Sequence, residues 1–243
     1  MSYVLIVTAT PGEFRGLKSK LSEFRSRNFT LRLEESGMGK INAALWLAQI
    51  LSTGPKPDIV IGAGTTGCLD LTLKTGDVLA TNEVIIADWL QAGDDFVHYA
   101  PYGAIDYGEP TAKVSQMVLS CSSPLVLKLL ETLGDSFQKG RILSSDTFIC
   151  DRKKKLDMGA TFGCRVCEME AGAVAMTAKR LGNIPWAQVK VVAEGLDEGF
   201  TDYVKMEKDI VQILANKTFE ALTVLDHIWL EMKAKEPKKS GKV

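Results

Sequence analysis

Short apolar runs rich in β-branched residues alternate along this chain with segments whose apolar residues recur at helical spacing. Runs of this kind are typical of strands, and the first two in the chain have the continuous apolar character of strands buried on both faces of a sheet. Three of them are prominent, at residues 3–8 (YVLIVT), 58–62 (DIVIG) and 186–193 (WAQVKVVA). Because helices separate such strands, the pattern predicts an α/β fold, with a central mixed sheet and helices on both faces.

The spacing of apolar and turn residues predicts the other elements. Helices are expected at 14–24, 41–51, 125–133, 171–181 and 210–229, and further strands at 29–34, 76–82, 83–87 and 141–143. Residues 88–116 have no clear period and are rich in Gly, Pro and Tyr, which predicts a long loop of a kind that is often functional. We expect one domain over residues 1–235 and a disordered tail at 236–243 (EPKKSGKV).

The composition excludes several classes of protein. The net charge is −1 and the pI is about 6.2, which argues against a nucleic acid or a membrane surface as the main partner. The five cysteines are odd in number and no secretory signal precedes them, so we expect free thiols and a cytoplasmic location. Zinc at Cys164-x-x-Cys167 would need further ligands, and His98 and His227 are the only histidines, so no metal or cofactor is expected.

Polar or small residues follow the predicted strands, where sites in α/β folds gather. Glu13 follows the first strand, the loop Gly64-Thr65-Thr66-Gly67 the second and Glu194 the last, while Glu168 and Glu170 precede a helix. Each has an ordinary alternative, such as a first-turn helix acid, a plain turn or a charge at the rim. The glycine-rich loop lacks both the P-loop and the dinucleotide spacing. The coincidence of all these residues on one sheet edge indicates a site.

Five motifs connect these residues to a known family. They are Glu13 after the first strand, Ser36-Gly37-Met38-Gly39-Lys40, Gly64-Thr65-Thr66-Gly67 with Leu73-Lys74-Thr75-Gly76-Asp77 behind it, Ser145-Asp146-Thr147-Phe148-Ile149, and Glu168-Met169-Glu170-Ala171-Gly172. In this order and at this spacing the chain resembles the methylthioadenosine/S-adenosylhomocysteine nucleosidases of the nucleoside phosphorylase superfamily. The resemblance covers nearly the whole chain and is weakest over residues 88–140. It implies a single-domain, three-layer α/β/α sandwich of the nucleoside phosphorylase type.

The resemblance also implies an activity, which is hydrolysis of the N-glycosidic bond of a purine nucleoside. Catalysis then needs a proton for the leaving purine, polar contacts to the sugar and an activated water. Glu170 is expected to hold the ribose hydroxyls and to stabilise the cationic sugar, and Glu13 to orient and deprotonate the water. The expected partner is a small purine nucleoside, bound by a homodimer whose interface includes the helix that starts at Lys40 and carries an exposed Trp46.

The rest of the expected site surrounds the sugar and the base. Met169 is expected against the sugar, Phe148 stacked on the base and the backbone of Ile149 at the purine edge. The floor near the water is assigned to Thr65, Thr66 and Gly67. Glu168 and Lys190 complete the site, with Glu168 bracing the loop or capping the helix. Aromatic walls for the 5′ substituent are sought in Trp89, Tyr99, Tyr102 and Tyr107, which could equally be core or interface residues.

The last strand departs from the family pattern. Relatives end this strand Arg-x-x-Ser-Asp, and the Asp delivers a proton to N7 of adenine; here the positions read Lys190-Val191-Val192-Ala193-Glu194. The acid is one methylene longer and its serine partner is lost, while Asp197 offers an alternative carboxylate. Three interpretations remain: an adenine-nucleoside hydrolase that tolerates the Glu, a hydrolase for another base or 5′ group such as futalosine, or a weakly active or inactive nucleoside-binding relative.

The nucleophile is predicted from what the glycine-rich loop lacks. A phosphorylase holds its phosphate with cationic groups, usually arginines. Residues 61–66 contain none, and the nearest candidates are Arg15 and Arg32, of which Arg32 is expected on an exposed strand face. Water is therefore the expected nucleophile.

Overall fold

A mixed sheet of nine strands organises the part of the chain that the computed structural model describes, namely residues 2–88, 90–92, 97–99, 118–198 and 200–235. Its main path runs β2-β1-β3-β10-β9-β5-β8, and β11 pairs with β3 and β4 off this path. The strands are β1 (Tyr3–Thr8), β2 (Thr30–Glu35), β3 (Ile59–Cys68), β4 (Val78–Thr81), β5 (Glu83–Ile86), β8 (Val118–Ser120), β9 (Ile142–Ser144), β10 (Val166–Glu168) and β11 (Trp186–Glu194). A separate hairpin joins β6 (Leu90–Ala92) and β7 (Val97–Tyr99).

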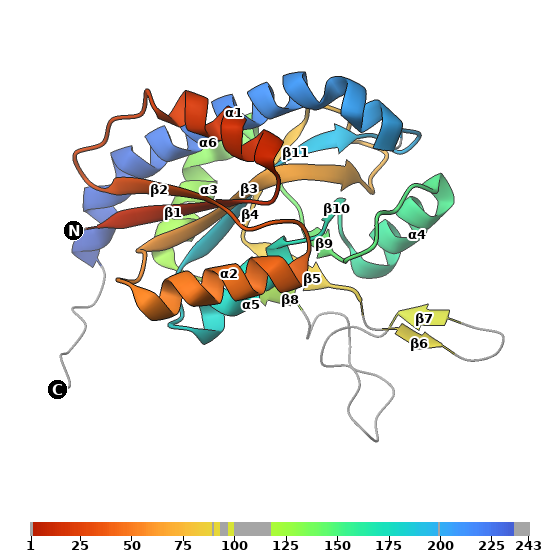
Figure 1. Ribbon diagram of the computed structural model, residues 1–243, viewed down its shortest axis with the longest axis horizontal. Coiled ribbons are helices and arrows are strands. Elements are labelled where there is room, and N and C mark those ends of the chain that lie inside the picture. The colour runs from red at the N-terminus through yellow and green to blue at the C-terminus, as the bar shows by residue number, and fades with distance from the viewer. Residues whose placement is uncertain (1, 89, 93–96, 100–117, 199, 236–243) are drawn as a thin grey trace.

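Helices cover both faces of this sheet (Figure 1). On one face lie α1 (Pro11–Leu21), α3 (Pro124–Leu133) and the long α6 (Phe200–Lys235), and on the other lie α2 (Lys40–Thr53) and α5 (Ala171–Arg180). A short 3-10 turn, η2 (Gly134–Ser136), follows α3, and α4 (Arg152–Phe162) lies at one end of the sheet. The predicted three-layer α/β/α arrangement is confirmed.

Strand β3 is the hub of the sheet because it pairs with three other strands. It lies parallel to β1 on one side and to β11 on the other, and its last residues pair antiparallel with β10. The prediction of a loop at residues 64–67 is therefore wrong, since the strand continues to Cys68. Residues 63–66 pair with β11 along one side, and Gly67 pairs with both β11 and β10. This pairing holds Gly64 and Gly67 in a strand despite the low strand propensity of glycine.

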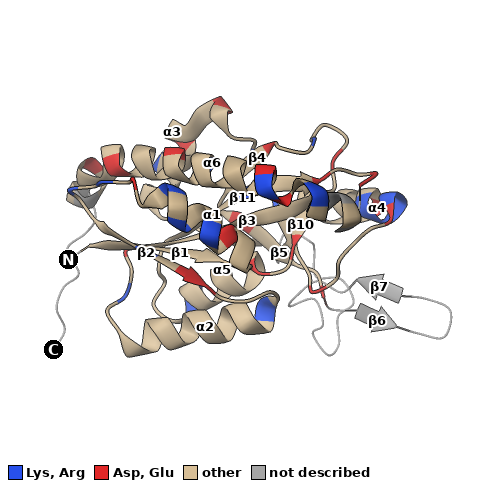
Figure 2. Ribbon diagram, turned by 45° about the horizontal axis from the view of Figure 1, so that its top comes forward, with Lys and Arg blue, Asp and Glu red and all other residues tan. Residues whose placement is uncertain are grey.

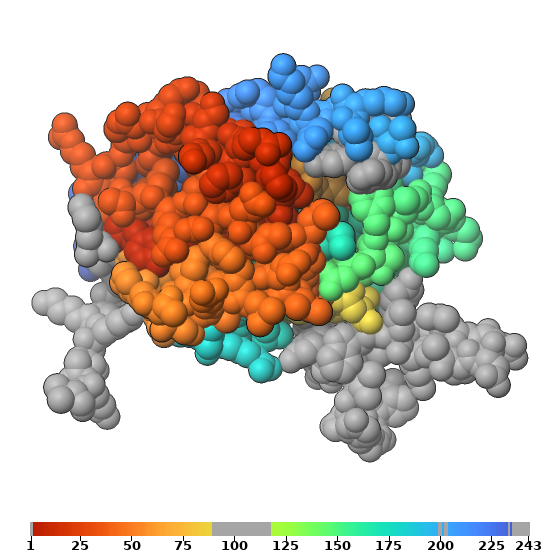
Figure 3. All heavy atoms as spheres, viewed as in Figure 1, coloured from red at the N-terminus to blue at the C-terminus, as the bar shows by residue number. Residues whose placement is uncertain are grey.

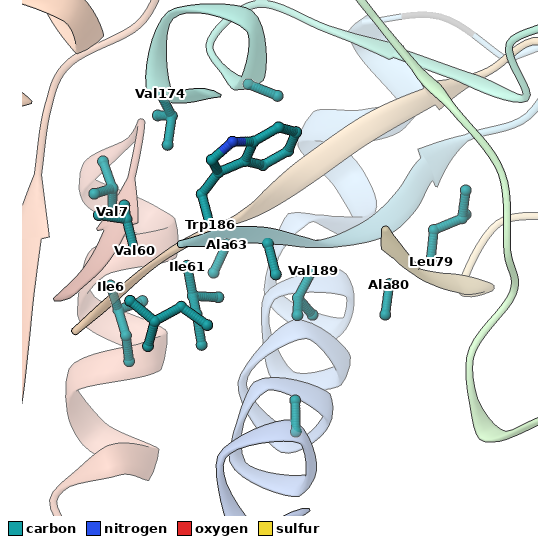
Figure 4. Close-up of a cluster of buried hydrophobic side chains, with 14 of the residues drawn as sticks. Ile6, Val7, Val60, Ile61, Ala63, Leu79, Ala80, Val174, Trp186 and Val189 are labelled. Atoms are coloured by element: carbon teal, nitrogen blue, oxygen red, sulfur yellow. The ribbon is translucent and has the colours of Figure 1, made fainter. Parts of the chain in front are cut away.

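The core forms where the central strands meet the helices. Trp186 of β11 lies beside Val174 of α5, and Ile6, Val60 and Ile61 fill the neighbouring strands (Figure 4). These residues are at most 2% exposed. The other predicted helices and strands are present, with ends that differ by a few residues except for α6, which was predicted at 210–229 and spans Phe200–Lys235.

Six short elements were not predicted: β6, β7, β8, β10, η2 and α4. The hairpin of β6 and β7 lies inside residues 88–116, where a loop without regular structure was predicted. The sequence of α4, RKKKLDMGATF, has too few apolar residues for a clear helical period. It is held at its ends instead, where the Asp151 side chain accepts from the Lys154 amide and Gly163 closes the helix at a φ of 61°. This left-handed conformation favours glycine.

Several sequence predictions fall outside what the structure describes. Trp89, Tyr102, Tyr107 and the tail at 236–243 lie outside the described residues, and for Tyr99 only the backbone in β7 is described. Trp46 is partly buried against the core, so the prediction of an exposed Trp46 is wrong. Among the described helices, none has both the length and the apolar character needed to cross a membrane.

Candidate active site

A cavity of about 140 Å³ lies where the ends of β1, β3, β10 and β11 meet the starts of α1 and α5. All three predicted catalytic acids, Glu13, Glu170 and Glu194, line it, so the structure brings them together. The lining residues are Ala9, Thr10, Glu13, Met38, Thr65, Thr66, Gly67, Thr147, Phe148, Ile149, Cys167, Glu168, Met169, Glu170, Ala193 and Glu194. Four of these carry a carboxylate, and none of the described lining residues is Arg, Lys or His.

Glu13 is held by the first turn of its own helix and by β3. Thr10 is the N-cap of α1, and it forms a capping box with Glu13: its side chain accepts from the Glu13 amide, and Glu13 Oε2 accepts from the Thr10 amide (3.1 Å). Oε2 also accepts from the Ala9 amide (3.0 Å). Oε1 accepts from the amide (2.7 Å) and the hydroxyl (2.9 Å) of Thr65. Glu13 thus makes the contacts expected of a first-turn helix acid and also lines the cavity, where it is 2% exposed.

These donors form an anion-binding site that the protein fills with its own carboxylate. The amides of Ala9 and Thr10 point out of a helix N-terminus, where the dipole also favours negative charge. The Thr65 amide points to the same place from the facing strand. All four hydrogen bonds end on Glu13, so no backbone donor of this group is left for an external anion such as phosphate.

The close approach of β3 to this carboxylate requires Gly64. A Cβ at position 64 would lie 3.1 Å from Glu13 Oε1 and 3.3 Å from the Lys190 ammonium. The glycine therefore gives room for a buried acid and a buried base beside the same strand. This is a packing role for one of the glycines of the motif.

Glu170 stands at the N-cap position of α5, and its side chain reaches across to the start of α2. Its Oε1 accepts from the Gly39 amide at 2.7 Å. Burial, together with the neighbouring charge of Glu168, raises the pKa of Glu170 to about 7, although Lys190 and the Gly39 hydrogen bond act in the opposite direction. Near neutral pH, this carboxyl is therefore shared between its protonated and ionised forms.

Glu168 performs the bracing and capping role that the sequence predicted. Its Oε2 accepts from the amides of Glu170 (3.0 Å) and Ala171 (2.8 Å) at the start of α5, and from the Lys190 ammonium (2.9 Å). Burial acts to lower the pKa of Lys190. The carboxylates of Glu168, Glu170 and Glu13 have the larger, opposite effect, so the net result is a raised pKa. Lys190 therefore remains an ammonium that compensates a cluster of acids.

Lys190 itself is not among the residues that line the cavity, although a substrate contact was predicted for it. Its side chain is buried between β11 and the neighbouring acids, with its ammonium on Glu168. The long side chain lies across β3, where Gly64 is its register partner. Its observed contacts support the acids from behind the cavity wall.

Glu194 ends β11 and faces the cavity, where it is 5% exposed. An irregularity in the pairing of β11 with β3 falls between Val192 and Glu194, so that Glu194 comes opposite Gly67. A Cβ on Gly67 would lie 3.8 Å from Glu194 Cγ, so this glycine borders the side chain. Asp197, the alternative carboxylate, forms an ion pair with Arg152 at the surface and does not line the cavity.

The remaining predicted contacts form the apolar and neutral walls. Phe148, Ile149 and Met169 line the cavity, with Phe148 45% exposed at its edge and Ile149 buried. Thr66 lines it too, and its hydroxyl donates to the Cys167 carbonyl at 2.6 Å, which connects β3 to β10. Arg32 pairs with Glu34 on the partly exposed β2, and neither Arg32 nor Arg15 lines the cavity.

Sequence reasoning missed Thr10, Met38 and Cys167. The capping pattern Thr10-x-x-Glu13 would have identified the first, and Met38 lies inside a motif that was recognised. No pattern marks Cys167, because the strand that places it at the cavity, β10, was not predicted. Burial raises the pKa of its thiol to about 12, so it is neutral at physiological pH.

Comparison with known proteins identifies the family of the chain. The family model of the phosphorylase superfamily matches residues 3–225. A 5′-methylthioadenosine/S-adenosylhomocysteine nucleosidase of Staphylococcus aureus is 30% identical over 168 residues, which is 67% of each chain. The enzyme of the same name from Halalkalibacterium halodurans is 27% identical over 208 residues, 80% of this chain and 86% of the relative.

Solved structures share the fold. The 5′-methylthioadenosine/S-adenosylhomocysteine nucleosidase of Helicobacter pylori superposes with a TM-score of 0.73 at 17% identity, covering 92% of this chain and 98% of the other. Futalosine hydrolase of the same organism gives 0.71 at 18% identity, covering 92% and 97%. Both enzymes thus have this three-layer arrangement.

The raised pKa of Glu170 predicts an unusual dependence of stability on pH. Between about pH 4.5, where a carboxyl titrates in the unfolded chain, and about pH 7, the folded protein binds more protons, so its free energy of unfolding falls as pH rises. The contribution of this one group is up to roughly 3 kcal/mol. Urea denaturation of the protein and of Glu170→Gln across this range measures it: the stability of the variant relative to the protein should increase with pH. A difference that does not vary with pH would contradict the raised pKa.

Proposed function

Because this chain belongs to the phosphorylase superfamily and, within it, to the methylthioadenosine/S-adenosylhomocysteine nucleosidases, we propose that it hydrolyses the N-glycosidic bond of a purine nucleoside. The products are the free base and a ribose derivative that carries the 5′ substituent. The proposed substrates are methylthioadenosine and S-adenosylhomocysteine, which the names of the relatives give.

The observation that carries the choice of hydrolysis is the position of the Glu13 carboxylate. It accepts hydrogen bonds from the amides of Ala9, Thr10 and Thr65. These donors would otherwise suit a phosphate. A phosphate oxygen placed there would also meet a carboxylate, with no lining cation among the described residues to offset the repulsion. Water has neither difficulty.

In the proposed reaction Glu13 activates the water that attacks C1′ of the ribose. Its four acceptor positions are already used, three by amides and one by the Thr65 hydroxyl. Only the hydroxyl can rotate away, so we assign the position of the water to the place that the Thr65 hydroxyl leaves. The water proton passes to Glu13 as the oxygen bonds to C1′.

Glu170 and Glu194 act on the two sides of the bond that breaks. The electron pair of the C1′–N9 bond moves into the purine, and Glu194 delivers a proton to N7 of the leaving base. Glu170 accepts hydrogen bonds from the ribose hydroxyls and stabilises the positive charge that develops on the sugar. Phe148 and the Ile149 backbone hold the base, Met169 packs against the sugar, and Thr66 and Gly67 form the floor.

Futalosine is a second candidate substrate. The departure at Ala193 and Glu194 lies where the base is protonated, and a futalosine hydrolase has the same fold. Because the departure changes the group opposite the purine N7 edge, it could change the preferred base. A weakly active nucleoside-binding protein is the remaining alternative, and the placement of Glu13 and Glu170 in one cavity argues against it.

A substrate panel tests the proposal. Methylthioadenosine, S-adenosylhomocysteine and futalosine are each incubated with the protein, and release of adenine or hypoxanthine is followed by chromatography. We expect adenine release to be the fastest and Glu170→Gln to reduce it by at least about 100-fold. The exposed Glu23→Gln serves as the matched control and should retain full activity.

Each alternative has its own outcome in this panel. Faster hypoxanthine release from futalosine would favour the second candidate. Ligand-induced thermal stabilisation without any product would favour a nucleoside-binding protein. Undiminished activity of Glu170→Gln would contradict the role given to that residue.

A homodimer and a cytoplasmic location are parts of the same proposal. Helix α2 lies on the surface and its orange spheres form part of the front face (Figure 3). Ile41 (72% exposed) and Leu45 (68%) stand one turn apart on it, and Met38 (63%), just before the helix, also lines the cavity. Such an apolar surface next to a site is typical of an interface. All five cysteines are free, as in a reducing compartment, which cell fractionation would test.

The interface is tested by charge insertion. Ile41→Glu should convert the dimer to a monomer in sedimentation velocity, because a carboxylate would be buried in the apolar contact. Leu127→Glu, at an exposed leucine of α3, is the matched control and should leave the mass unchanged. A dimer that survives Ile41→Glu, or a monomeric parent protein, would contradict the proposal.

A further inference from the structure

Lys155 is the exception in a run of four basic residues. Arg152, Lys153 and Lys154 at the start of α4 are exposed, and this helix carries the blue segments at the edge of the molecule (Figure 2). Lys155 is 0% exposed and is among the largest fully buried side chains. Burying an ammonium costs several kcal/mol unless the fold supplies partners. The burial of Lys155 therefore indicates that nearby groups stabilise its charge.

The partners of Lys155 lie at the end of β11, next to the cavity. Its ammonium donates to the carbonyls of Gly195 (2.8 Å) and Glu198 (3.0 Å), and it stands 4.0 Å from Glu194 Oε2. Glu194 therefore has the cavity on one side and a buried cation on the other. Lys155 does not itself line the cavity.

We infer that Lys155 is the positioning residue of Glu194, an inference that rests on the proposed function. When Glu194 protonates the leaving purine, its O–H bond breaks, an N7–H bond forms, and a carboxylate remains. A cation 4.0 Å away in a buried site stabilises that developing negative charge and so makes Glu194 a stronger acid. The ammonium also fixes the place of the carboxyl group by holding the loop that follows it.

The local sequence explains why a lysine is needed here. Ala193 has no side-chain group that could hold the neighbouring acid, and Glu194 is a flexible side chain with three rotatable bonds. Lys155 fixes the following loop from one side through two carbonyls. Glu198 fixes it from the other, because its Oε2 accepts from the Gly195 amide (2.8 Å) and the Thr75 hydroxyl (2.6 Å).

Two thiols and two carboxylates of the described residues lie near the pair. Burial raises the pKa of the Cys68 thiol and raises that of Cys167 to about 12, so both remain neutral at physiological pH. The carboxylate of Glu168 is paired with Lys190, and that of Glu198 is engaged in the loop. Lys155 thus places a buried cation 4.0 Å from Glu194 Oε2.

The test is the pH profile of base release by Lys155→Met, with Thr75→Val as the matched control. Thr75→Val loosens the same loop without removing the cation, and should change kcat by less than about threefold. Lys155→Met should lower kcat by about 100-fold with KM within threefold. Because Glu194 acts in its protonated form, loss of the cation should also move the alkaline limb of the profile to higher pH. In a Glu194→Gln background, Lys155→Met should add less than about threefold.

The outcomes separate this inference from the proposed function. No base release by the parent protein from any nucleoside would contradict the proposed function. Release by the parent, together with an unshifted pH limb or equal losses in Lys155→Met and Thr75→Val, would contradict the inference alone. Should Lys155→Met fail to fold, Lys155→Gln, which still offers an amide to the carbonyls but has no charge, must show the same pH shift.

Discussion

The burial of four carboxylates around one cavity is the constraint on which the rest of this structure depends. Glu13, Glu168 and Glu194 are between 2% and 7% exposed, and an unpartnered carboxylate at such a depth would be strongly unfavourable. The fold supplies amides from the starts of α1 and α5 and from β3, together with the ammonium groups of Lys155 and Lys190. The ends of β1, β3, β10 and β11 must therefore meet at one place. Gly64 and Gly67 leave room there for the side chains of Glu13, Lys190 and Glu194.

The arrangement of these charges is suited to a cationic transition state. Both lysines lie behind the acids, and the described part of the cavity wall presents carboxylates without cations. A ribosyl group that develops positive charge is attracted to such a wall, whereas a phosphate is repelled by it. Glu13 strengthens this preference because it occupies the amide donors that an anion would need. The same geometry thus accounts for the proposed sugar chemistry and for the choice of water.

The α/β fold and the positions of three acids at the cavity could be predicted because each is marked by a pattern of neighbouring residues in the sequence. Buried strands are short apolar runs, and Glu13, Glu170 and Glu194 stand where such runs or motifs end. Contacts between distant segments leave no such pattern. The strand character of residues 63–67 depends on pairing with β10 and β11, and the burial of Lys155 depends on how α4 packs against the end of β11. From sequence, Lys155 is one of four similar basic residues, and Lys190 looked like a substrate contact rather than a support.

The central claim is that the Glu13 carboxylate fills the anion site, so that water attacks the sugar. Product analysis in ¹⁸O-labelled water with excess inorganic phosphate tests it most directly. The account predicts that mass spectrometry finds one ¹⁸O at the anomeric position of the released ribose derivative and no sugar 1-phosphate. Formation of a ribose 1-phosphate as the main product would contradict it, because phosphate would then have entered the place that Glu13 occupies.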